Sequence, residues 1–497
     1  MYSKCSEAEV SAQVLQLRES IMRRGISQKP ILTALIASVV LLTLGCSEPQ
    51  SDNALAEDII MPDVEVVEAV ISSPSKPVDN DMDTRDISAA TTTLNEQEKA
   101  LAAWVDGRQE NILAELKTYV EINTGTDNIA GIDKFRNILD SELQQLGFNT
   151  EEMSVEPIDV LGCDSSQMQF ANHLYAVRGS GNGKRLFLNG HMDTVFSADD
   201  EFQTLEVLPN GVLKGPGVID MKGGLVVLIN ALRALDSQGA LNDASITVFL
   251  NSDEEIGSLS SRPTIEKLAA VHDIGLVFEG TKNNRMTRLR KGLGQARIKV
   301  TGRESHAGTA HEKGVSANLE MAHKIIELEK LTDYEKKVTV NTGVVSGGEK
   351  RNTISGCSDT YVDMRYPTAE LGAYLDEGLR KIAEKRYIEN PAYPEFPKTE
   401  YWSKLHRPAK AGNEIVDQLI AEAMGVSAII GEPVVGANTS GGGTDGSIAQ
   451  AAGLPTLDTL GVNGSGAHSS REETTVASVM ARTKLAAIII GRVLAAE

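Results

Sequence analysis

The sequence predicts an α/β fold whose mostly parallel sheet carries helices on both faces, with a small α+β domain inserted into it. Three apolar runs, at residues 185–191, 245–255 and 274–280, alternate with helical patterns such as 223–235. Near-continuous apolar strands separated by helices are typical of a parallel sheet that is buried on both faces. With 497 residues, of which 41% are hydrophobic, the chain is long enough for more than one globular domain.

The pattern changes near Lys291, where shorter alternating segments begin. Residues 295–302 alternate polar and apolar side chains, and a helix, two strands and a second helix follow as far as residue 385. With a last strand near 398–403, this order predicts a small domain with a four-stranded antiparallel sheet. The α/β pattern returns after His406, so we expect the small domain to be inserted into the larger one.

The amino-terminal residues have the order of a secretory signal. Basic residues at 22–30 precede an apolar run at 31–44, and Gly45 and Cys46 follow directly. The run is shorter than the roughly 20 residues that a membrane-spanning helix needs. The Gly-Cys pair resembles a bacterial lipoprotein processing site. We therefore expect a lipid-anchored protein on the periplasmic side of a bacterial membrane, or a secreted one.

Downstream of the signal, the chain is rich in Asp, Glu, Ser and Pro, which predicts a disordered tether. A capping-box pattern from Thr93 to Glu96, followed by apolar residues at helical spacing, predicts that the folded part starts with a helix. The expected segments are a leader and signal at 1–46, an acidic tether at 47–92, the first part of the larger domain at 93–291, the inserted domain at 292–405 and the second part of the larger domain at 406–497.

The overall charge argues against one class of partner. The net charge is -21 at pH 7, whereas binding a phosphate backbone needs clustered Lys and Arg. We therefore expect no nucleic-acid partner. Downstream of the signal, Cys163 and Cys357 lack the spacing of a zinc site, and a disulfide between them is allowed outside the cytoplasm.

Polar side chains end each predicted strand of the larger domain. His191 and Asp193 follow the first strand, and residues two apart in an extended segment point to the same side. The carboxyl ends of parallel strands meet at one edge of a sheet, where ligands gather. The full set of candidates is His191, Asp193, Asp220, Glu254, Glu255, Glu279 and His468. So many carboxylates in one place would repel one another without a cation, which predicts a metal site.

Five motifs, in order along the chain, resemble the metal-site signatures of the dizinc aminoacylase and carboxypeptidase family. They are GHMDTV, GPGVIDMKGG, SDEEIGS, VFEG and GAHSS. Three stretches are most similar to the glutamate carboxypeptidases of the folate-cleaving type, namely DEEIGSLSSR, ESHAG and GGGTDG. The resemblance implies a dizinc catalytic domain beside an inserted dimerisation domain, and hence a homodimer formed through the inserted domain.

The same resemblance assigns the metal ligands. Asp220 would bridge two zinc ions, with His191 and Glu279 completing one site. Glu255 and His468 would complete the other. Two imidazoles and three carboxylates leave coordination positions open for water and substrate, unlike a closed Cys-rich structural site.

Three further residues receive catalytic roles from the resemblance. Asp193 would accept the second ring proton of His191 and so fix its tautomer. Glu254 would act as the general base that takes a proton from water and passes it to the leaving amine. His306, in ESHAG, would reach across from the partner subunit to stabilise the oxyanion.

The resemblance also identifies substrate-binding residues. Asn352 and Arg365 match positions that hold the free carboxylate of the substrate, while Gly442, Gly443 and Thr444 resemble a segment that lines the same pocket. An alternative interpretation of Arg365 is a structural ion pair on its own strand.

The leading hypothesis is a zinc-dependent metallocarboxypeptidase that cleaves an amide bond to release a C-terminal amino acid, with glutamate as a candidate. Its substrate would be a peptide or an N-acyl amino acid. One alternative is a deacylase that removes acetyl or succinyl groups from amino acids. A second alternative is a metal-bound binding protein that has lost catalysis, which the retention of Glu254 beside the full ligand set argues against.

Overall fold

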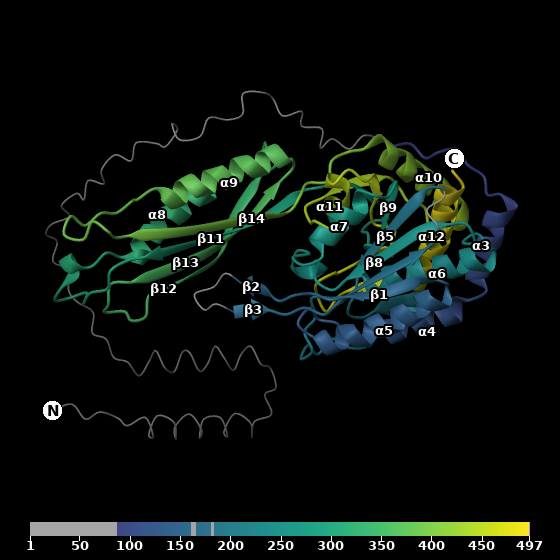
Figure 1. The fold of residues 1–497 in the computed structure, drawn as a ribbon, viewed down its shortest axis with the longest axis horizontal. Coiled ribbons are helices and arrows are strands. Elements are labelled where there is room, and N and C mark those ends of the chain that lie inside the picture. Colours follow the sequence, from purple (N-terminus) through teal and green to yellow (C-terminus); the bar gives the residue numbers. More distant parts are fainter. Residues whose placement is uncertain (1–86, 161–165, 180–182, 497) are drawn as a thin grey trace, which may run out of the picture. The chain divides into compact units, whose positions relative to one another are not determined.

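The computed structural model describes residues 87–160, 166–179 and 183–496 (Figure 1). The predicted signal, with Cys46, lies outside the described residues, as do Cys163 and the tether up to residue 86. Within the described ranges, no helix combines the length and apolar composition needed to cross a bilayer. The last residues of the predicted tether contact the folded part, because the backbone N–H of Ala90 donates to the carbonyl of Ala421 at 2.9 Å.

A six-stranded mixed sheet forms the centre of the larger domain, in the order β1-β4-β8-β5-β9-β16 (Figure 1). Its strands are β1 (Asn149–Met153), β4 (His173–Arg178), β5 (Arg185–His191), β8 (Ser245–Asn251), β9 (Ile274–Val277) and β16 (Thr456–Leu457). Neighbours from β8 to β16 pair in parallel, whereas β4 runs antiparallel to both β1 and β8. The mostly parallel α/β fold class is therefore confirmed. The sequence pattern did not reveal β1, because its NTEEM sequence is largely exposed and has no apolar run.

Helices cover both faces of this sheet, as predicted. They are α3 (Glu96–Asp106), α4 (Gln109–Val120), α5 (Ile129–Gln145), α6 (Lys222–Ser237), α7 (Arg262–Ala269), α10 (Glu414–Ile430), α11 (Asp445–Ala451) and α12 (Val476–Ala495). Side chains of β5 alternate between the faces: Leu186 and Leu188 join the core under α6 and α12, and Phe187 joins a second core under α7 and α11. This alternation is what makes the strand apolar along its whole length.

The leading helix differs from the prediction at both ends. Its N-cap is Asn95 rather than Thr93: the Asn95 side chain accepts from the Glu98 N–H at 2.8 Å, and Glu98 Oε2 accepts from the Asn95 N–H at 2.9 Å. Glu98 is also bound by Arg492 of α12 at 2.7 Å, a tertiary contact that favours this register. The predicted single helix is two helices, because α3 ends at Asp106 and α4 begins at Gln109.

Three small sheets complete the larger domain among the described residues. The first has the order β17-β18-β7-β6 and contains β6 (Glu206–Val207), β7 (Val212–Lys214), β17 (Gly464–Ser465) and β18 (Glu473–Thr475). The second pairs β10 (Met286–Arg290) with β15 (Ala437–Ser440), and the third pairs β2 (Ile158–Val160) with β3 (Ser166–Met168). Since β17 and β18 flank His468, the first of these sheets positions a predicted site residue.

The inserted segment forms a four-stranded antiparallel sheet in the order β12-β13-β11-β14, as predicted. Its elements are β11 (Gly292–Thr301), α8 (Ala317–Glu329), β12 (Thr339–Gly347), β13 (Cys357–Tyr366), α9 (Ala369–Glu384) and β14 (Lys398–Arg407). Ile298, Val362 and Met364 lie in a core that also holds side chains of α8 and α9. Figure 1 shows both helices on the same side of the sheet.

A buried ion pair within α8 contacts the carboxyl end of α9, the other helix of the inserted segment. Lys324 and Glu320 are fully buried, and Lys324 Nζ lies 2.9 Å from Glu320 Oε1. Lys324 also donates to the carbonyls of Ile382 and Ala383, at 3.2 and 2.9 Å, near the carboxyl end of α9. A lysine in this position satisfies carbonyl groups that the helix itself leaves without partners.

Replacing Lys324 by Met should therefore destabilise the protein by about 3–5 kcal/mol, because the Glu320 carboxylate would stay buried without its counter-charge. Urea unfolding followed by circular dichroism measures the change. The matched control is Lys330→Met, since Lys330 follows the same helix and pairs with Glu327 but is 61% exposed. Equal unfolding midpoints for the two variants would contradict this assignment.

Candidate active site

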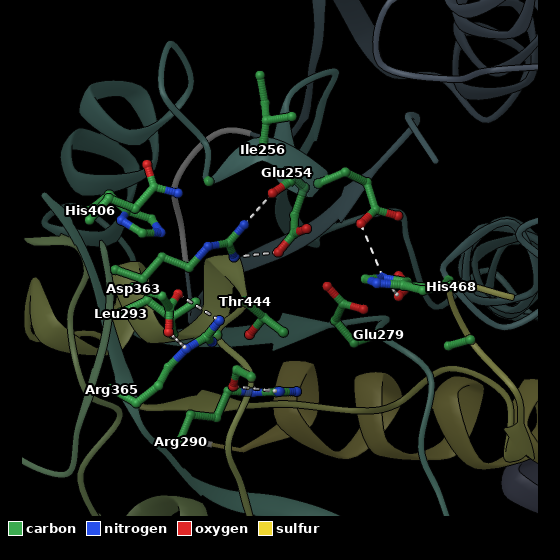
Figure 2. A pocket seen from close by; sticks show the side chains of 18 of the residues that line it. Glu254, Ile256, Glu279, Arg290, Leu293, Asp363, Arg365, His406, Thr444 and His468 are labelled. Carbon is green, nitrogen blue, oxygen red and sulfur yellow. Dashed lines mark hydrogen bonds and ion pairs between the residues drawn. The ribbon is translucent and has the colours of Figure 1, made fainter. Parts of the chain in front are cut away.

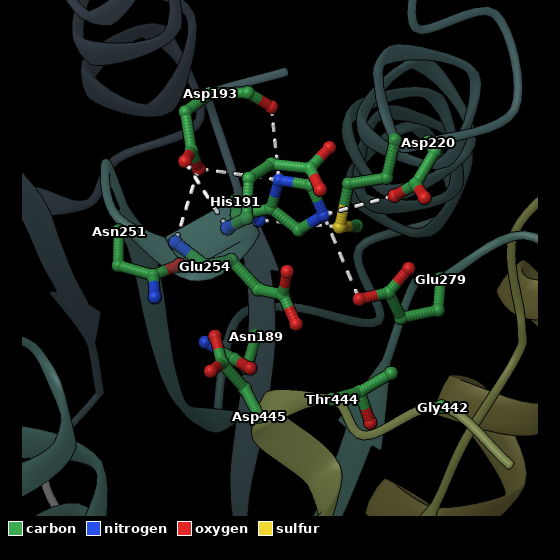
Figure 3. Close-up of polar contacts among 12 residues, drawn as sticks. Asn189, His191, Asp193, Asp220, Asn251, Glu254, Glu279, Gly442, Thr444 and Asp445 are labelled. Carbon is green, nitrogen blue, oxygen red and sulfur yellow. Dashed lines mark hydrogen bonds and ion pairs between the residues drawn. The ribbon is translucent and has the colours of Figure 1, made fainter. Parts of the chain in front are cut away.

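The predicted site residues follow the carboxyl ends of neighbouring parallel strands (Figure 3). His191 is the last residue of β5, and Asp193 follows two positions later. Glu254 begins a short 3-10 helix after β8, and Glu279 lies two residues beyond the end of β9. Because these three strands are adjacent, residues that are far apart in the sequence meet at one edge of the sheet.

His191 and Asp193 contact each other, as the two-residue spacing predicts. His191 Nδ1 lies 3.0 Å from the Asp193 carbonyl oxygen and 3.3 Å from its carboxylate Oδ1. Both side chains are buried. The second ring nitrogen, Nε2, faces Asp220 Oδ1 at 3.2 Å and Glu279 Oε1 at 3.6 Å (Figure 3). With Nδ1 engaged in this way, Nε2 is the nitrogen that can bind a metal.

The Asp193 carboxylate has further partners, which connect two strand ends. It accepts from the backbone N–H groups of Glu254 and Glu255, each at 3.2 Å, and from the Thr126 hydroxyl at 2.9 Å. Asp193 thus orients the imidazole at the end of β5 and also fixes the turn that carries both glutamates after β8.

The structure brings the candidate ligands together in two groups that share Asp220. One group is His191, Asp220 and Glu279, and the other is Asp220, Glu255 and His468, with the ligand atoms of each group within 4.8 Å of one another. His468 Nε2 lies 3.1 Å from Asp220 Oδ2 and 3.2 Å from Glu255 Oε2. Asp220 therefore presents one carboxylate oxygen to each imidazole, which is the arrangement expected of a bridging ligand.

A buried carboxylate that the sequence pattern did not identify positions Asp220. Glu472 Oε1 accepts from the backbone N–H groups of Ile219 and Asp220 at 2.7 and 3.0 Å, and Oε2 accepts from that of Gly217 at 3.1 Å. Glu472 lies four residues after His468. It therefore connects the loop of one ligand to the loop of another.

The carboxylates of the cluster raise the pKa values of both imidazoles. Burial alone would lower the pKa of His191, but hydrogen bonds to Asp193, Asp220 and Glu279 outweigh it and hold that pKa well above its ordinary value. Hydrogen bonds to Asp220 and Glu255 raise the pKa of His468 to about 11. Both imidazoles would thus hold a proton between the carboxylates at neutral pH, and a metal ion would have to displace it.

The carboxylates of the cluster show why a divalent cation fits. Burial, and then the charge of Asp220, raises the pKa of Glu279 to about 8 and that of Glu255 well above its usual range. Glu255 Oε1 is buried and has no hydrogen-bond partner among the described residues. Carboxylate oxygens and imidazole nitrogens are typical ligands of zinc. The residues present therefore fit a metal ion in each group.

Glu254, the predicted base, is in neither ligand group and is bound by Arg407. Both side chains are buried, and the Arg407 guanidinium donates from Nη1 to Glu254 Oε1 and from Nη2 to the Glu254 carbonyl (Figure 2). Arg407 is the last residue of β14 in the inserted sheet. Burial would lower the pKa of Arg407, but the charges of Glu254 and Asp445 outweigh it and raise that pKa. The guanidinium thus stays charged beside Glu254.

A cavity of about 520 Å³ lies beside the two ligand groups (Figure 2). Its walls include the ligands Asp220, Glu255, Glu279 and His468, the predicted base Glu254, the predicted substrate residues Arg365, Gly442, Gly443 and Thr444, and the unpredicted residues Arg290, Asp363 and Arg407. Arg290 donates to the Gly442 carbonyl at 3.2 Å and pairs with the buried Asp458 at 2.6 Å, so it holds the glycine segment in place.

Arg365 lies in the cavity and also takes part in an ion pair, so both interpretations of this residue have structural support. It donates from Nε and Nη2 to the Asp363 carboxylate at 2.7 and 3.0 Å, and from Nη1 to the Gly441 carbonyl at 3.3 Å. Its side chain remains 31% exposed. The guanidinium is therefore held in place at the cavity wall while part of it faces open space.

His306 and Asn352 are not brought to the cavity of their own chain. Both are exposed in the inserted domain, and neither lines the cavity that contains the ligand groups. They lie close to each other, because Ala307 N–H donates to the Asn352 carbonyl at 3.0 Å. His306 Nδ1 accepts from the backbone N–H groups of Gly308 and Thr309, which leaves Nε2 directed elsewhere.

Local sequence patterns did not identify several residues of the site. Arg407 and Arg290 are ordinary strand residues in the sequence, and each acts through a partner more than 100 positions away. Asp445 did have a signal, since it lies in GGGTDG; it accepts a hydrogen bond from the Ser258 hydroxyl, four residues after the predicted base.

The chain is similar to several known proteins. The model of peptidase family M20/M25/M40 matches residues 187–492. Carboxypeptidase G2 of Pseudomonas sp. (strain RS-16) is 28% identical over 81% of this chain and 94% of its own length. Acetylornithine deacetylase of Proteus mirabilis (strain HI4320) is 31% identical over 46% of this chain and 59% of its own. A tripeptidase structure from Staphylococcus aureus covers 78% of this chain and 98% of its own, with a TM-score of 0.62 and 22% identity.

The two ligand groups predict separable metal binding. Zinc titrated into chelator-treated protein should bind at two sites, and His468→Ala should remove one of them, because His468 belongs to only one group. Isothermal titration calorimetry gives the stoichiometry. His323→Ala is the matched control, since His323 is exposed and stacks on Tyr387. Unchanged stoichiometry in His468→Ala would rule out the second group as a site.

Proposed function

The chain belongs to peptidase family M20/M25/M40, and we propose that it releases a C-terminal amino acid from a peptide or N-acyl amino acid by zinc-dependent hydrolysis of an amide bond. Membership of the family makes it a hydrolytic enzyme that acts on peptide or acyl-amino acid bonds. The observation that carries the finer proposal is the cavity that joins both ligand groups, Glu254 and the partly exposed guanidinium of Arg365. Glutamate is a candidate for the released amino acid.

Two zinc ions held by the ligand groups would polarise the substrate carbonyl and activate a water molecule. Glu254 accepts the proton of that water and returns it to the leaving amine. Arg407 binds Oε1 of Glu254, so the other carboxylate oxygen, Oε2, is the one that exchanges the proton. Asp193 keeps both strand ends in register during the reaction, because it contacts His191 and the backbone of Glu254.

Arg365 supplies the local cation that a carboxylate substrate needs. The chain carries a net charge of -21, which disfavours approach of an anion unless a positive group lies at the site. Nη1 of Arg365 now donates to a backbone carbonyl at 3.3 Å and could donate to a substrate oxygen instead. A guanidinium also offers two parallel donors to a carboxylate, which an ammonium group does not.

We also propose that the enzyme works as a homodimer formed through the inserted domain. His306 and Asn352 are exposed in that domain and do not line the cavity of their own chain. A second copy would bring them to the substrate, where His306 would stabilise the oxyanion and Asn352 the free carboxylate. A lipid on Cys46 would keep this dimer at the periplasmic face of a membrane.

The second candidate function is removal of an acyl group from an N-acyl amino acid. The similarity to acetylornithine deacetylase, which is 31% identical over 245 residues, favours it. Both candidates break an amide bond with the same site and differ in which half of the substrate is recognised. A panel of N-acyl amino acids and dipeptides, assayed together with metal content, separates them: a carboxypeptidase depends on the released residue, and a deacylase on the acyl group.

Replacing Glu254 by Gln should reduce turnover by about 10²-fold or more, because the general base is lost. Metal content should not change, since Glu254 is in neither ligand group. Steady-state kinetics and metal analysis by mass spectrometry measure the two effects. Glu266→Gln, on the surface of α7, is the control. If zinc is lost along with activity, Glu254 is a ligand and its assigned role is wrong.

Replacing Arg365 by Lys should lower kcat/KM by about 10- to 100-fold for substrates with a free carboxylate, the range expected when charged hydrogen bonds are lost. The corresponding amides should be affected far less. Kinetics on matched acid and amide substrates provide the test, with the melting temperature measured in parallel. Equal losses on acid and amide, together with a lower melting temperature, would show that the pair with Asp363 is only structural.

A further inference from the structure

We propose that His173 and Asp253 are positioning residues, which hold the turn that carries Glu254 and Glu255. This inference rests on the proposed function, because it gives two buried side chains a part in placing the candidate base and a candidate ligand. Both side chains are buried, neither lines the catalytic cavity and neither is in a ligand group. They would act through hydrogen bonds rather than through contact with the substrate.

The Asp253 carboxylate binds the chain where it returns from the turn. Its Oδ2 accepts from the backbone N–H groups of Ser260 and Ser261, at 2.6 and 3.3 Å, and from the Ser260 hydroxyl at 2.7 Å. Its Oδ1 accepts from the Ser261 hydroxyl at 2.6 Å. These four donors are neutral, and a buried carboxylate needs such donors to replace the water it has lost. The position of the carboxylate and the path of the returning chain therefore depend on each other.

The segment 254–261 is thus held at both ends by buried carboxylates. At its start, Asp193 accepts from the backbone N–H groups of both glutamates, and at its end Asp253 binds the two serines. Between these ends, Gly257 and Ser258 have left-handed φ angles of 104° and 55°. A serine in this conformation is uncommon and costs free energy. The turn therefore depends on the contacts at its two ends to keep its shape.

His173 lies beside this segment because β4 runs antiparallel to β8, so that the start of β4 meets the end of β8. Its Nδ1 accepts from the backbone N–H of Ser252 at 3.3 Å, which places the ring proton on Nε2. The Ser252 hydroxyl lies 3.1 Å from Nδ1 but donates to the Ala171 carbonyl. Burial lowers the pKa of His173, which favours this neutral form of the ring.

A serine hydroxyl connects the imidazole to the carboxylate. Nε2 of His173 lies 3.2 Å from the Ser260 hydroxyl oxygen, and the hydroxyl proton is donated to Asp253 Oδ2. Since a hydroxyl has one proton, its oxygen is left to accept from Nε2. His173, Ser260 and Asp253 therefore form a buried relay of two hydrogen bonds, in which each group has a single role and strengthens the next bond.

The ring of His173 also has an apolar contact, which the experiment must separate from the relay. It packs edge-on against Phe249 of β8, with 5.5 Å between the ring centres. A phenylalanine at position 173 keeps a ring for this contact but has no nitrogen for either hydrogen bond. A glutamine loses the ring but can place an amide N–H donor near the position of Nε2.

The test compares His173→Phe with His173→Gln on the substrate that is hydrolysed fastest, at zinc saturation. His173→Phe should lower kcat about 10- to 100-fold and change KM by less than about twofold, because the base is displaced while substrate binding remains. His173→Gln should recover kcat to within about threefold of the unmodified protein. Asp253→Asn should lower kcat at least as much as His173→Phe, because an amide nitrogen cannot accept from a backbone N–H.

His272→Gln is the matched control. His272 also takes part in two hydrogen-bond contacts, since its Nε2 lies 2.8 Å from the Thr247 hydroxyl and its Nδ1 lies 2.6 Å from the Leu268 carbonyl oxygen. Thr247, however, lies toward the amino end of β8, whereas the site follows the carboxyl end. The kcat of His272→Gln should therefore equal that of the unmodified protein.

A spectroscopic measurement separates this inference from the proposed function. Co²⁺ bound to chelator-treated protein absorbs visible light, and its spectrum depends on the arrangement of its ligands, of which Glu255 would be one. The spectrum should change in His173→Phe and Asp253→Asn, but not in His173→Gln or His272→Gln. If these changes are found and no substrate is hydrolysed, the proposed function fails and the positioning role stands.

Three results would overturn the inference. The first is an unchanged kcat in His173→Phe, and the second is an equal loss in His173→Phe and His173→Gln, which would assign the effect to packing on Phe249. The third is a Co²⁺ spectrum that is the same in all variants. If His173→Phe does not fold, His173→Asn takes its place, because an asparagine can accept from the Ser252 N–H but is too short to donate to Ser260.

Discussion

The carboxylate of Asp193 fixes the geometry on which the site depends. It is fully buried, and its partners are the ring of His191 and the backbone N–H groups of Glu254 and Glu255. A buried carboxylate without such donors would be costly, whereas one with several of them is held in a single position. The same side chain therefore sets a candidate ligand, a candidate base and the distance between them.

Near Asp193, the carboxylates of Asp220, Glu255 and Glu279 lie close together, and the positive groups of the protein compensate their charge only in part. Asp220 contacts both imidazoles, while burial and the charge of Asp220 raise the pKa values of Glu255 and Glu279. Away from the cluster, among the described residues, buried Arg290 pairs with Asp458 and buried Lys324 with Glu320. The contrast agrees with a site that is completed by cations rather than by side chains.

The inserted domain contributes a buried arginine to the candidate site. Arg407, at the end of its sheet, binds the carboxylate and the carbonyl of Glu254, and the Tyr366 hydroxyl donates to the Arg407 carbonyl at 2.9 Å. A shift of this sheet would move the guanidinium and alter the position of the candidate base, Glu254. The same sheet presents Arg365 to the cavity, so the candidate base and the candidate carboxylate-binding residue share one structural support.

Local sequence patterns determined the fold class, the strands β5, β8 and β9, and the set of side chains at the carboxyl edge of the sheet. Those features depend on periodicity and on position relative to a strand end, which short stretches of sequence encode. The start of the leading helix was predicted two residues early, because Thr93 and Asn95 are each followed by a glutamate three residues later. The second glutamate, Glu98, is the one that Arg492 binds from 394 positions away.

The side chains that bind the site residues could be identified only from the tertiary structure. Glu254 and Arg407 are 153 positions apart, and Glu472 reaches back 252 positions to the Asp220 backbone. A buried arginine or glutamate has the same local pattern as an exposed one, so its role becomes visible only when its partner is known. Two further predicted residues, His306 and Asn352, are exposed and do not line the cavity of their own chain. The chemistry of a side chain is local, but the desolvation and charge pairing that tune it come from the packed structure.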